Sequence, residues 1–326
     1  MQSPSNLFES VRQKYLSDNL IKRMMVEQSF TIEQSYINLA MVQTKEQQEK
    51  EKKLRRSQKM QEREDEQDSS SKTYNPNILG TYEEIYGTKS PIAMEEIFNK
   101  CTDQIKKVLV LGRAGIGKST FCQYATFRWA KGEIWSEYAL VLLIYLRKLT
   151  IIRYPTGTKY TLRHLLENEY YPCEDLSNEQ IRYFQELCRE HRVLWILDGY
   201  DEFAESTSEH LRDVFDHICQ TQHHILTSRP FAIRFEYDVK MEIIGFTDDN
   251  ITKYAEQFFD QKQNQEKGAS LECQKLLQFL KSNSNHWGVA HIPVNLELIC
   301  SLWSESDWSE KKVLTITSLY DNITEW

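Results

Sequence analysis

The chain has 326 residues, of which 40% are hydrophobic, and carries a formal net charge of −8 at pH 7. This length allows one sizeable core and a second, smaller one. The acidic balance argues against a basic face that captures nucleic acid or an anionic membrane. We therefore expect neither nucleic acid nor membrane among the partners.

The seven cysteines are dispersed and contain no CxxC pair, so they indicate neither a zinc site nor a disulfide framework. The sequence has no uncharged apolar run long enough to span a membrane. Its first residues also lack the basic flank and apolar middle of a secretory signal. These features predict a cytoplasmic protein.

Residues 1–43 are expected to form a partly helical N-terminal extension. Leu7, Val11 and Tyr15 fall at helical spacing, and Thr31 and Gln34 have the spacing of a capping box. The run "SYINLAMV" that follows fits a helix or a short strand equally well.

Residues 44–75 change character abruptly, because nearly every position is charged or polar and no apolar seam exists for a partner helix. We predict a charged linker, in which a solvated helix passes into a disordered serine-rich stretch. A coiled coil or a basic contact patch is the alternative that the sequence leaves open.

Residues 76–246 alternate strand and helix patterns, which predicts a parallel sheet with crossover helices. The expected strands are near-continuous apolar runs, typical of strands covered on both faces; they lie at 108–112, 139–146, 193–198, 224–228 and 239–244. The helical patterns between them lie around 118–131, 161–168, 178–191 and 206–220. From 247 to 326 the strands stop, and we expect a small all-helical subdomain.

The segment "GRAGIGKS" follows the first expected strand and fits the pattern GxxxxGK[ST] between a strand and a helix. Its glycines let backbone N–H groups converge on phosphate oxygens, and the next helix adds its positive N-terminal end. Lys118 is expected to reach the β- and γ-phosphates, and the Ser119 hydroxyl to ligate Mg²⁺. We predict an α/β P-loop NTPase whose nucleotide contacts are Gly112, Arg113, Ala114, Gly115, Ile116, Gly117, Lys118, Ser119 and Thr120. The alternative is a glycine-rich turn that binds nothing.

The next expected strand of interest, in "HRVLWILDGYDEF", ends at Asp198, and Asp201 and Glu202 follow it. A carboxylate at the end of a strand neighbouring a P-loop can hold Mg²⁺, and one just beyond can orient and deprotonate a water. We assign Asp198 to the metal, Glu202 to the water and Asp201 to either role. Ordinary turn carboxylates after a buried strand are the alternative.

The strand in "HHILTSRPF" ends in Thr227, Ser228 and Arg229. We expect Arg229 to sense the γ-phosphate, because a guanidinium matches phosphate oxygens in bidentate fashion and stays charged. A surface arginine before a proline is the alternative. His223 and His224 have no third ligand at a suitable spacing, so we interpret them as the start of the strand.

These motifs, together with "IIGFTDDNITKYAEQFF" and "IPVNLELICSLW", resemble the NACHT subgroup of signal-transduction ATPases with numerous domains over about residues 80–326. The DGxDE form of the acidic motif is the most specific part. The resemblance implies the following roles: phosphate and Mg²⁺ binding for Lys118 and Ser119, the Walker B role for Asp198 and Asp201, catalysis for Glu202, sensor 1 for Arg229, and adenine packing for Pro293.

The resemblance further implies ATP or ADP and Mg²⁺ as ligands, slow hydrolysis, and oligomerisation or a protein partner on activation, in signalling of an innate-defence kind. The family continues into a winged-helix domain, and residues 247–326 are expected to stop before it. Two other readings stay open: a nucleotide-binding scaffold with negligible turnover that recruits a partner, and a small-molecule phosphotransferase. The phosphotransferase calls for a lid of arginines, and no arginine follows residue 247.

Overall fold

The computed structural model describes residues 6–22, 29–36, 40–43, 92–173, 175–206, 209–230, 237, 239–263, 269–282 and 284–303. The chain divides into two compact units. The first comprises Met1–Lys22, Gln28–Tyr36 and Ala93–Ile243, and the second comprises Arg23–Glu27, Ile37–Ile92 and Ile244–Trp326. The expected charged linker, 44–75, lies outside the described residues.

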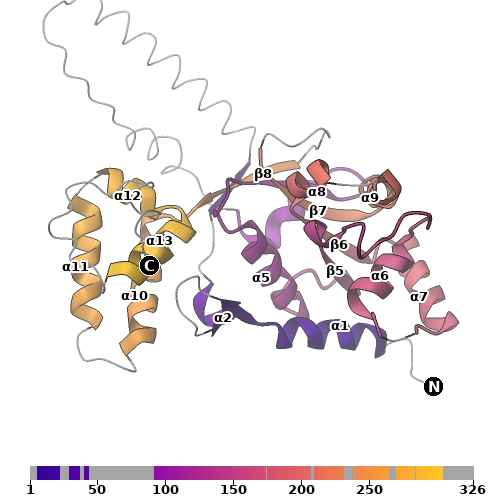
Figure 1. Cartoon of the computed structure of the whole chain (residues 1–326), viewed down its shortest axis with the longest axis horizontal. Helices are drawn as coiled ribbons and strands as arrows, with labels where there is room; N and C mark the ends of the chain where they lie inside the picture. Colours follow the sequence, from indigo (N-terminus) through magenta and orange to yellow (C-terminus); the bar gives the residue numbers. More distant parts are fainter. Residues whose placement is uncertain are drawn as a thin grey trace, which may run out of the picture. The chain divides into compact units, whose positions relative to one another are not determined.

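Five parallel strands form the centre of the first unit (Figure 1). They are β4 (Lys107–Leu111), β5 (Leu140–Tyr145), β6 (Val193–Asp198), β7 (His223–Ser228) and β8 (Val239–Gly245). Their order is β8-β4-β7-β6-β5, and each neighbouring pair is parallel. Every residue of β6 and β7 is buried, as the apolar runs of the sequence predict. The expected parallel α/β fold is confirmed.

The longer helices fall between the strands, where the sequence predicts them. They are α5 (Lys118–Ala130), α6 (Leu162–Tyr170), α7 (Asn178–Arg189) and α9 (Glu209–Thr221). The start of α7 shows why: Ser177 and Gln180 form a capping box, with Gln180 N donating to Ser177 Oγ at 3.2 Å and Ser177 N donating to Gln180 Oε1 at 2.9 Å. Three shorter helices were not predicted: η1 (Met94–Lys100), η2 (Leu146–Lys148) and α8 (Tyr200–Ser206).

The N-terminal extension begins with α1 (Asn6–Ser17), which packs against α5. The predicted helical spacing is confirmed, since Val11 and Tyr15 are buried. The side chain of Arg12 lies over the ring of Trp129, 4.3 Å from its centroid, and its Nη1 donates to the carbonyls of Trp129 and Ala130 near the end of α5. Helix α1 is therefore an integral part of the first unit.

Strand β5 stands at one end of the strand order, and two tyrosines bind its outer side. Leu143 N donates to the hydroxyls of Tyr15 at 3.0 Å and Tyr170 at 2.6 Å. Tyr15 Oη donates to Val141 O at 3.1 Å, Tyr170 Oη lies 2.9 Å from Leu143 O, and the two hydroxyls lie 2.5 Å apart. The two side chains thus occupy hydrogen-bonding positions that a further strand would take. We call these residues the tyrosine pair.

The run "SYINLAMV", for which helix and strand both stayed open, begins with the last residue of a short helix, Ser35, and ends in a strand at 40–42. Residues 37–39 lie outside the described residues. Strands β1 (Leu20–Lys22) and β2 (Ser29–Thr31) pair antiparallel, and α2 (Ile32–Ser35) follows. The predicted capping box is wrong: Thr31 is the N-cap residue, but its side chain makes no cap hydrogen bond, and the helix ends within about one turn. Strand β3 (Ala40–Gln43) belongs to the second unit.

The described helices of the second unit are α10 (Asp248–Gln263), α11 (Ala269–Ser282), α12 (Ser284–Ala290) and α13 (Pro293–Trp303). Hydrogen bonds tie the start of α10 to the end of α12. Phe246 N donates to His291 O, and Trp287 Nε1 donates to Asp248 Oδ1, both at 2.9 Å. The described part of residues 247–326 is therefore helical, as expected. None of the described helices combines the length and apolar character needed to cross a membrane.

Candidate functional site

The predicted phosphate-binding loop connects β4 to α5. Gly115 and Gly117 have φ angles of 70° and 98°, a backbone conformation that favours glycine. Gly112 is required for space, because a Cβ there would lie 2.7 Å from Ile116 Cγ2. All three glycines of the motif are thus fixed by the shape of the loop.

Lys118 is the first residue of α5 and folds back over the loop. Its Nζ donates to Gly112 O at 2.8 Å and to Arg113 O at 3.0 Å. Burial lowers the pKa of Lys118, while Asp201 and Asp198 act in the opposite direction. The N-cap residue is Gly117, which has no side chain to cap the first N–H groups of the helix. A loop of exposed backbone that ends in such a helix start fits a phosphate group.

Asp198 closes β6 and is 5% exposed. Its Oδ1 accepts a hydrogen bond from Thr227 Oγ1 at 2.6 Å and one from Cys122 Sγ at 3.8 Å. Burial raises the pKa of the Cys122 thiol, so it stays protonated and donates. Thr227 Oγ1 also accepts from Gly199 N at 3.0 Å. Asp198 is therefore held by β7 and by the helix of the phosphate-binding loop.

The strand order corrects one expectation. We expected β6 to neighbour the strand of the phosphate-binding loop, but β7 lies between β6 and β4. Gly112 N donates to Ser228 O at 3.1 Å, which extends the β4–β7 pairing into the loop. The order brings the end of β7, with Thr227 and Arg229, between the loop and Asp198.

Asp201 lies in the first turn of α8, is 6% exposed and contacts Arg229 through both carboxylate oxygens. Arg229 N donates to Oδ1 at 3.2 Å, and Arg229 Nε lies 2.9 Å from Oδ2. One carboxylate thus holds the backbone and the side chain of the same arginine. We call this contact the Asp201–Arg229 clasp.

Four further predicted site residues differ in their exposure and in the unit that carries them. Glu202 and Ser119 are exposed, and Thr120 is half-buried. Glu202 follows Asp201 in α8, and a Cβ built on Gly199 would lie 3.9 Å from Glu202 Oε2. Pro293 is the first residue of α13 in the second unit. The roles of these four residues, like those of the other predicted site residues, stay predictions.

Three residues contribute to the site or its strand in ways that the sequence did not reveal. In the sequence Cys122 is one of seven dispersed cysteines, although its place four residues after Lys118, on the same face of a helix, is a usable signal. Thr227 was noted only as a strand end. His224 starts β7 with His223, as predicted, and its ring bonds to Gln222 O at 2.9 Å and Tyr237 Oη at 2.8 Å.

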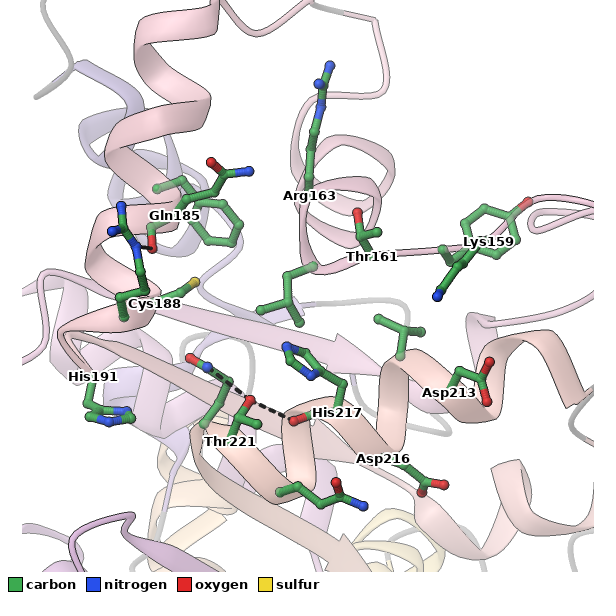
Figure 2. A pocket seen from close by; sticks show the side chains of 17 residues that line it. Lys159, Thr161, Arg163, Gln185, Cys188, His191, Asp213, Asp216, His217 and Thr221 are labelled. Atoms are coloured by element: carbon green, nitrogen blue, oxygen red, sulfur yellow. Dashed lines mark hydrogen bonds between the residues drawn. The ribbon is translucent and has the colours of Figure 1, made fainter.

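A groove of about 1140 Å³ lies elsewhere in the first unit, among α6, α7 and α9. Its wall carries cations and carboxylates together, including Arg163 from the start of α6 and Asp213 and Asp216 from α9 (Figure 2). None of the phosphate-binding loop residues lines it. The groove is therefore distinct from the candidate site.

The fold and the site together define a class. A parallel sheet carries a glycine-rich phosphate-binding loop between β4 and α5, a buried carboxylate at the end of β6 and an arginine after β7. This combination is that of a P-loop NTPase.

Within this class, a family model identifies the domain: residues 106–262 match the NACHT domain family. This match confirms the NACHT-domain P-loop NTPase that the sequence motifs predicted for this part of the chain.

Named relatives agree. The chain is 29% identical over 257 residues to nucleotide-binding oligomerization domain-containing protein 2 of Hylobates lar, covering 68% of this chain and 23% of that protein. It is 26% identical over 231 residues to human NACHT, LRR and PYD domains-containing protein 13, covering 62% and 20%. The chain thus spans about a quarter or less of these relatives. A Walker-type ATPase of Pyrococcus abyssi matches with a TM-score of 0.38 and 13% identity over 70% of each chain.

Proposed function

We propose that this protein is a regulatory switch that binds ATP and ADP and hydrolyses ATP slowly with Mg²⁺. One observation carries the proposal: Lys118, Asp198 and the Asp201–Arg229 clasp converge where β4, β6 and β7 end. Burying a carboxylate close to a lysine costs folding free energy. Such an arrangement beside a loop that fits a phosphate group is therefore typical of a site that binds a charged ligand. Polyphosphate with a divalent cation supplies both signs of charge.

The residues divide the work. The loop N–H groups and Lys118 bind phosphate oxygens, which requires Lys118 Nζ to exchange its carbonyl acceptors for phosphate. Ser119 and Asp198 supply the oxygen ligands that Mg²⁺ prefers. When bound, the cation neutralises developing charge on the phosphates. Glu202, an exposed residue in the first turn of α8, orients the attacking water.

The regulatory part of the proposal concerns the populations of two arrangements of the protein, one with ATP bound and one with ADP bound. A nucleotide acts as a switch only if ATP and ADP favour different arrangements of the protein. We propose that Pro293 packs near the adenine and so links α13 to nucleotide binding. The name of the Hylobates lar relative mentions nucleotide binding and oligomerization. We accordingly propose self-assembly or a protein partner as the output, in cytoplasmic signalling of an innate-defence kind.

A second function, a nucleotide-binding scaffold with negligible turnover, has one observation in its favour. In this structure Arg229 pairs with Asp201, so the two charges largely compensate one another. A single-turnover assay separates the two functions: bound ATP converts to ADP in a switch and stays ATP in a scaffold. Glu202→Gln should keep ATP bound and stop its conversion, because binding and water activation use different side chains.

The first experiment identifies what the protein carries. The chain is purified without added nucleotide and denatured, and the released nucleotide is identified by chromatography. Lys118→Ala serves as the test variant and Lys159→Ala, an exposed lysine outside the loop, as the matched control. We expect ADP from the wild type and the Lys159 variant and none from the Lys118 variant. Titration with ATP, ADP and GTP follows, and an empty protein that binds none of them overturns the proposal.

A further inference from the structure

The two buried aspartates at the candidate site have different neighbours. Asp198 accepts hydrogen bonds from a hydroxyl and a thiol, both of them neutral groups. Asp201 instead forms an ion pair with Arg229 and accepts the backbone N–H of the same residue. The two carboxylates are thus already specialised before any ligand binds.

This difference bears on where a divalent cation binds. A cation at Asp201 would be repelled by the guanidinium that this carboxylate already holds at 2.9 Å, and like charges at such a distance repel strongly when partly buried. Asp198 has no charged hydrogen-bond donor among its named partners, Thr227 and Cys122. Asp198 is therefore the better metal ligand of the two.

The geometry of the clasp also restricts Arg229. A guanidinium has five N–H donors, one on Nε and four on the two Nη atoms. Asp201 takes Nε at 2.9 Å and leaves the Nη side of the fork to reach another acceptor. The Arg229 side chain is 41% exposed, whereas the side chain of Asp201 is 7% exposed. The buried carboxylate thus holds the Nε side of the guanidinium, which we call its inner edge. The Nη groups form the outer edge and remain for another acceptor.

The turn that carries Asp201 is fixed to the strand that carries Arg229. Thr227 Oγ1 accepts the N–H of Gly199, a residue with a φ of 86° that starts the turn after β6. Tyr200 and Phe203 anchor α8, since both are buried and both contact the ring of Phe215 on α9. The positions of Asp201 and Arg229 are therefore set by the same two strand ends.

We infer that Asp201 is a positioning residue, which holds Arg229 so that its outer N–H groups meet the terminal phosphoryl group of a nucleoside triphosphate. It is neither a metal ligand nor the base that activates water. The inference rests on the proposed nucleotide binding and adds a source of its specificity. Through Arg229, Asp201 sets the preference for a nucleoside triphosphate over a diphosphate. A diphosphate has no γ-phosphoryl group for Arg229 to contact.

The test compares the binding of a non-hydrolysable ATP analogue and of ADP, each with and without Mg²⁺, by titration calorimetry. Asp201→Asn keeps the side-chain size but removes the charge that holds Nε. We expect its affinity for the ATP analogue to fall about tenfold, the effect of one charge-assisted contact, and its affinity for ADP to change less than about twofold. Mg²⁺ should still strengthen binding of the analogue. In Asp198→Asn the Mg²⁺ effect should disappear.

A double-variant cycle tests the coupling. If Asp201 acts through Arg229, the double variant Asp201→Asn with Arg229→Ala binds the ATP analogue no more weakly than Arg229→Ala alone. Additive losses overturn the inference, as does a loss of the Mg²⁺ effect in Asp201→Asn. Should Asp201→Asn fail to fold by circular dichroism, Arg229→Lys replaces it. A lysine has no Nε–Nη fork, so the preference for the ATP analogue should fall to the same extent.

The outcomes also separate this inference from the proposed function. A wild-type protein that binds neither nucleotide contradicts the nucleotide switch itself. A wild-type protein that binds both, together with an Asp201→Asn variant that keeps the full preference for the ATP analogue, contradicts only the role of Asp201.

Discussion

Two polar clusters of the first unit are built in opposite ways. At the ends of β4, β6 and β7, Lys118, Asp198, Asp201 and Arg229 bring charges together beside an exposed loop. At the outer side of β5, the tyrosine pair bonds to the backbone of Val141 and Leu143 without any charge. Burial raises the pKa of both Tyr15 and Tyr170, so their hydroxyls stay neutral.

The comparison teaches how to tell a ligand site from a structural one. The tyrosine pair is complete: its hydroxyls satisfy backbone groups at a strand edge and one another. The charged cluster is incomplete, because among the described residues its lysine donates hydrogen bonds to loop carbonyls, which are weak partners for a cation beside carboxylates. Neutral closed networks stabilise a fold, whereas concentrated charge with exchangeable partners serves a ligand.

The largest expected effect breaks the structural cluster. Tyr15→Ala removes a buried ring and leaves Leu143 N–H with one acceptor fewer. We expect the free energy of unfolding to fall by about 3–5 kcal/mol, the usual cost of truncating a buried aromatic residue. Urea denaturation measures it, and ADP affinity should not change under conditions where the variant is folded. Reduced ADP affinity in the folded variant would show that the two clusters are coupled.

The next prediction tests a second closed network, at the start of β7. Burial lowers the pKa of His224 to about 4 from the model-peptide value of about 6.5, so its ring stays neutral between Gln222 O and the Tyr237 hydroxyl. Because the unfolded chain binds this proton at a higher pH than the fold does, stability is present above about pH 6.5 and is lost as the pH falls towards 4.

Urea denaturation across this pH range, compared with His224→Gln, isolates the effect of the histidine. The wild type should lose about 3 kcal/mol more than the variant between these two pH values. Equal losses in the two proteins would mean that His224 takes up its proton in the fold as readily as in the unfolded chain.

The third prediction breaks the charged cluster and leaves the structural one intact. Lys118→Ala should weaken nucleotide binding at least about a hundredfold, because the loop loses its only lysine contact to the phosphates. The stability of the nucleotide-free protein should stay within about 0.5 kcal/mol of the wild type, as for other substitutions of partly exposed side chains. Calorimetric titration and thermal unfolding measure the two quantities. A stability loss without an affinity loss would assign Lys118 a structural role.

Thr227→Val sharpens the comparison, since it removes a neutral group from the charged cluster. The hydroxyl donates to Asp198 and accepts from Gly199 N–H, so both partners lose a bond in a buried place. We expect a loss of about 2 kcal/mol in stability by urea denaturation. Ser228→Ala is the matched control, because Ser228 Oγ bonds only to the carbonyl of Arg229 among its named contacts. A loss no larger than that of the control would contradict the assignment.

The smallest expected effect separates ring from hydroxyl in the tyrosine pair. Tyr15→Phe keeps the ring but removes the group that bonds to Val141 O and Leu143 N. Tyr170 still bonds to Leu143, so we expect a loss of about 1 kcal/mol in urea denaturation. A loss as large as that of Tyr15→Ala would mean that the hydroxyl, and not the buried ring, provides the stability.

The same two clusters show how far the sequence could be interpreted. The strands and the phosphate-binding loop follow from local patterns, because strands buried on both faces are apolar runs and the loop is one contiguous motif. The Asp201–Arg229 clasp joins residues 28 positions apart, and the tyrosine pair joins residues 155 positions apart. Both depend on which strand ends or edges lie together, and the order of β4, β7 and β6 was not predicted.

Helix α5 connects the phosphate-binding loop to helix α1 of the N-terminal extension. Its first turn follows the phosphate-binding loop, and its last carbonyls accept hydrogen bonds from Arg12 of α1. A helix of 13 residues is a stiff rod about 20 Å long. Any displacement of its start along the axis is passed to its far end, where the N-terminal extension is attached. A shift of the phosphate-binding loop along this axis would therefore be transmitted to α1 at the far end of the helix.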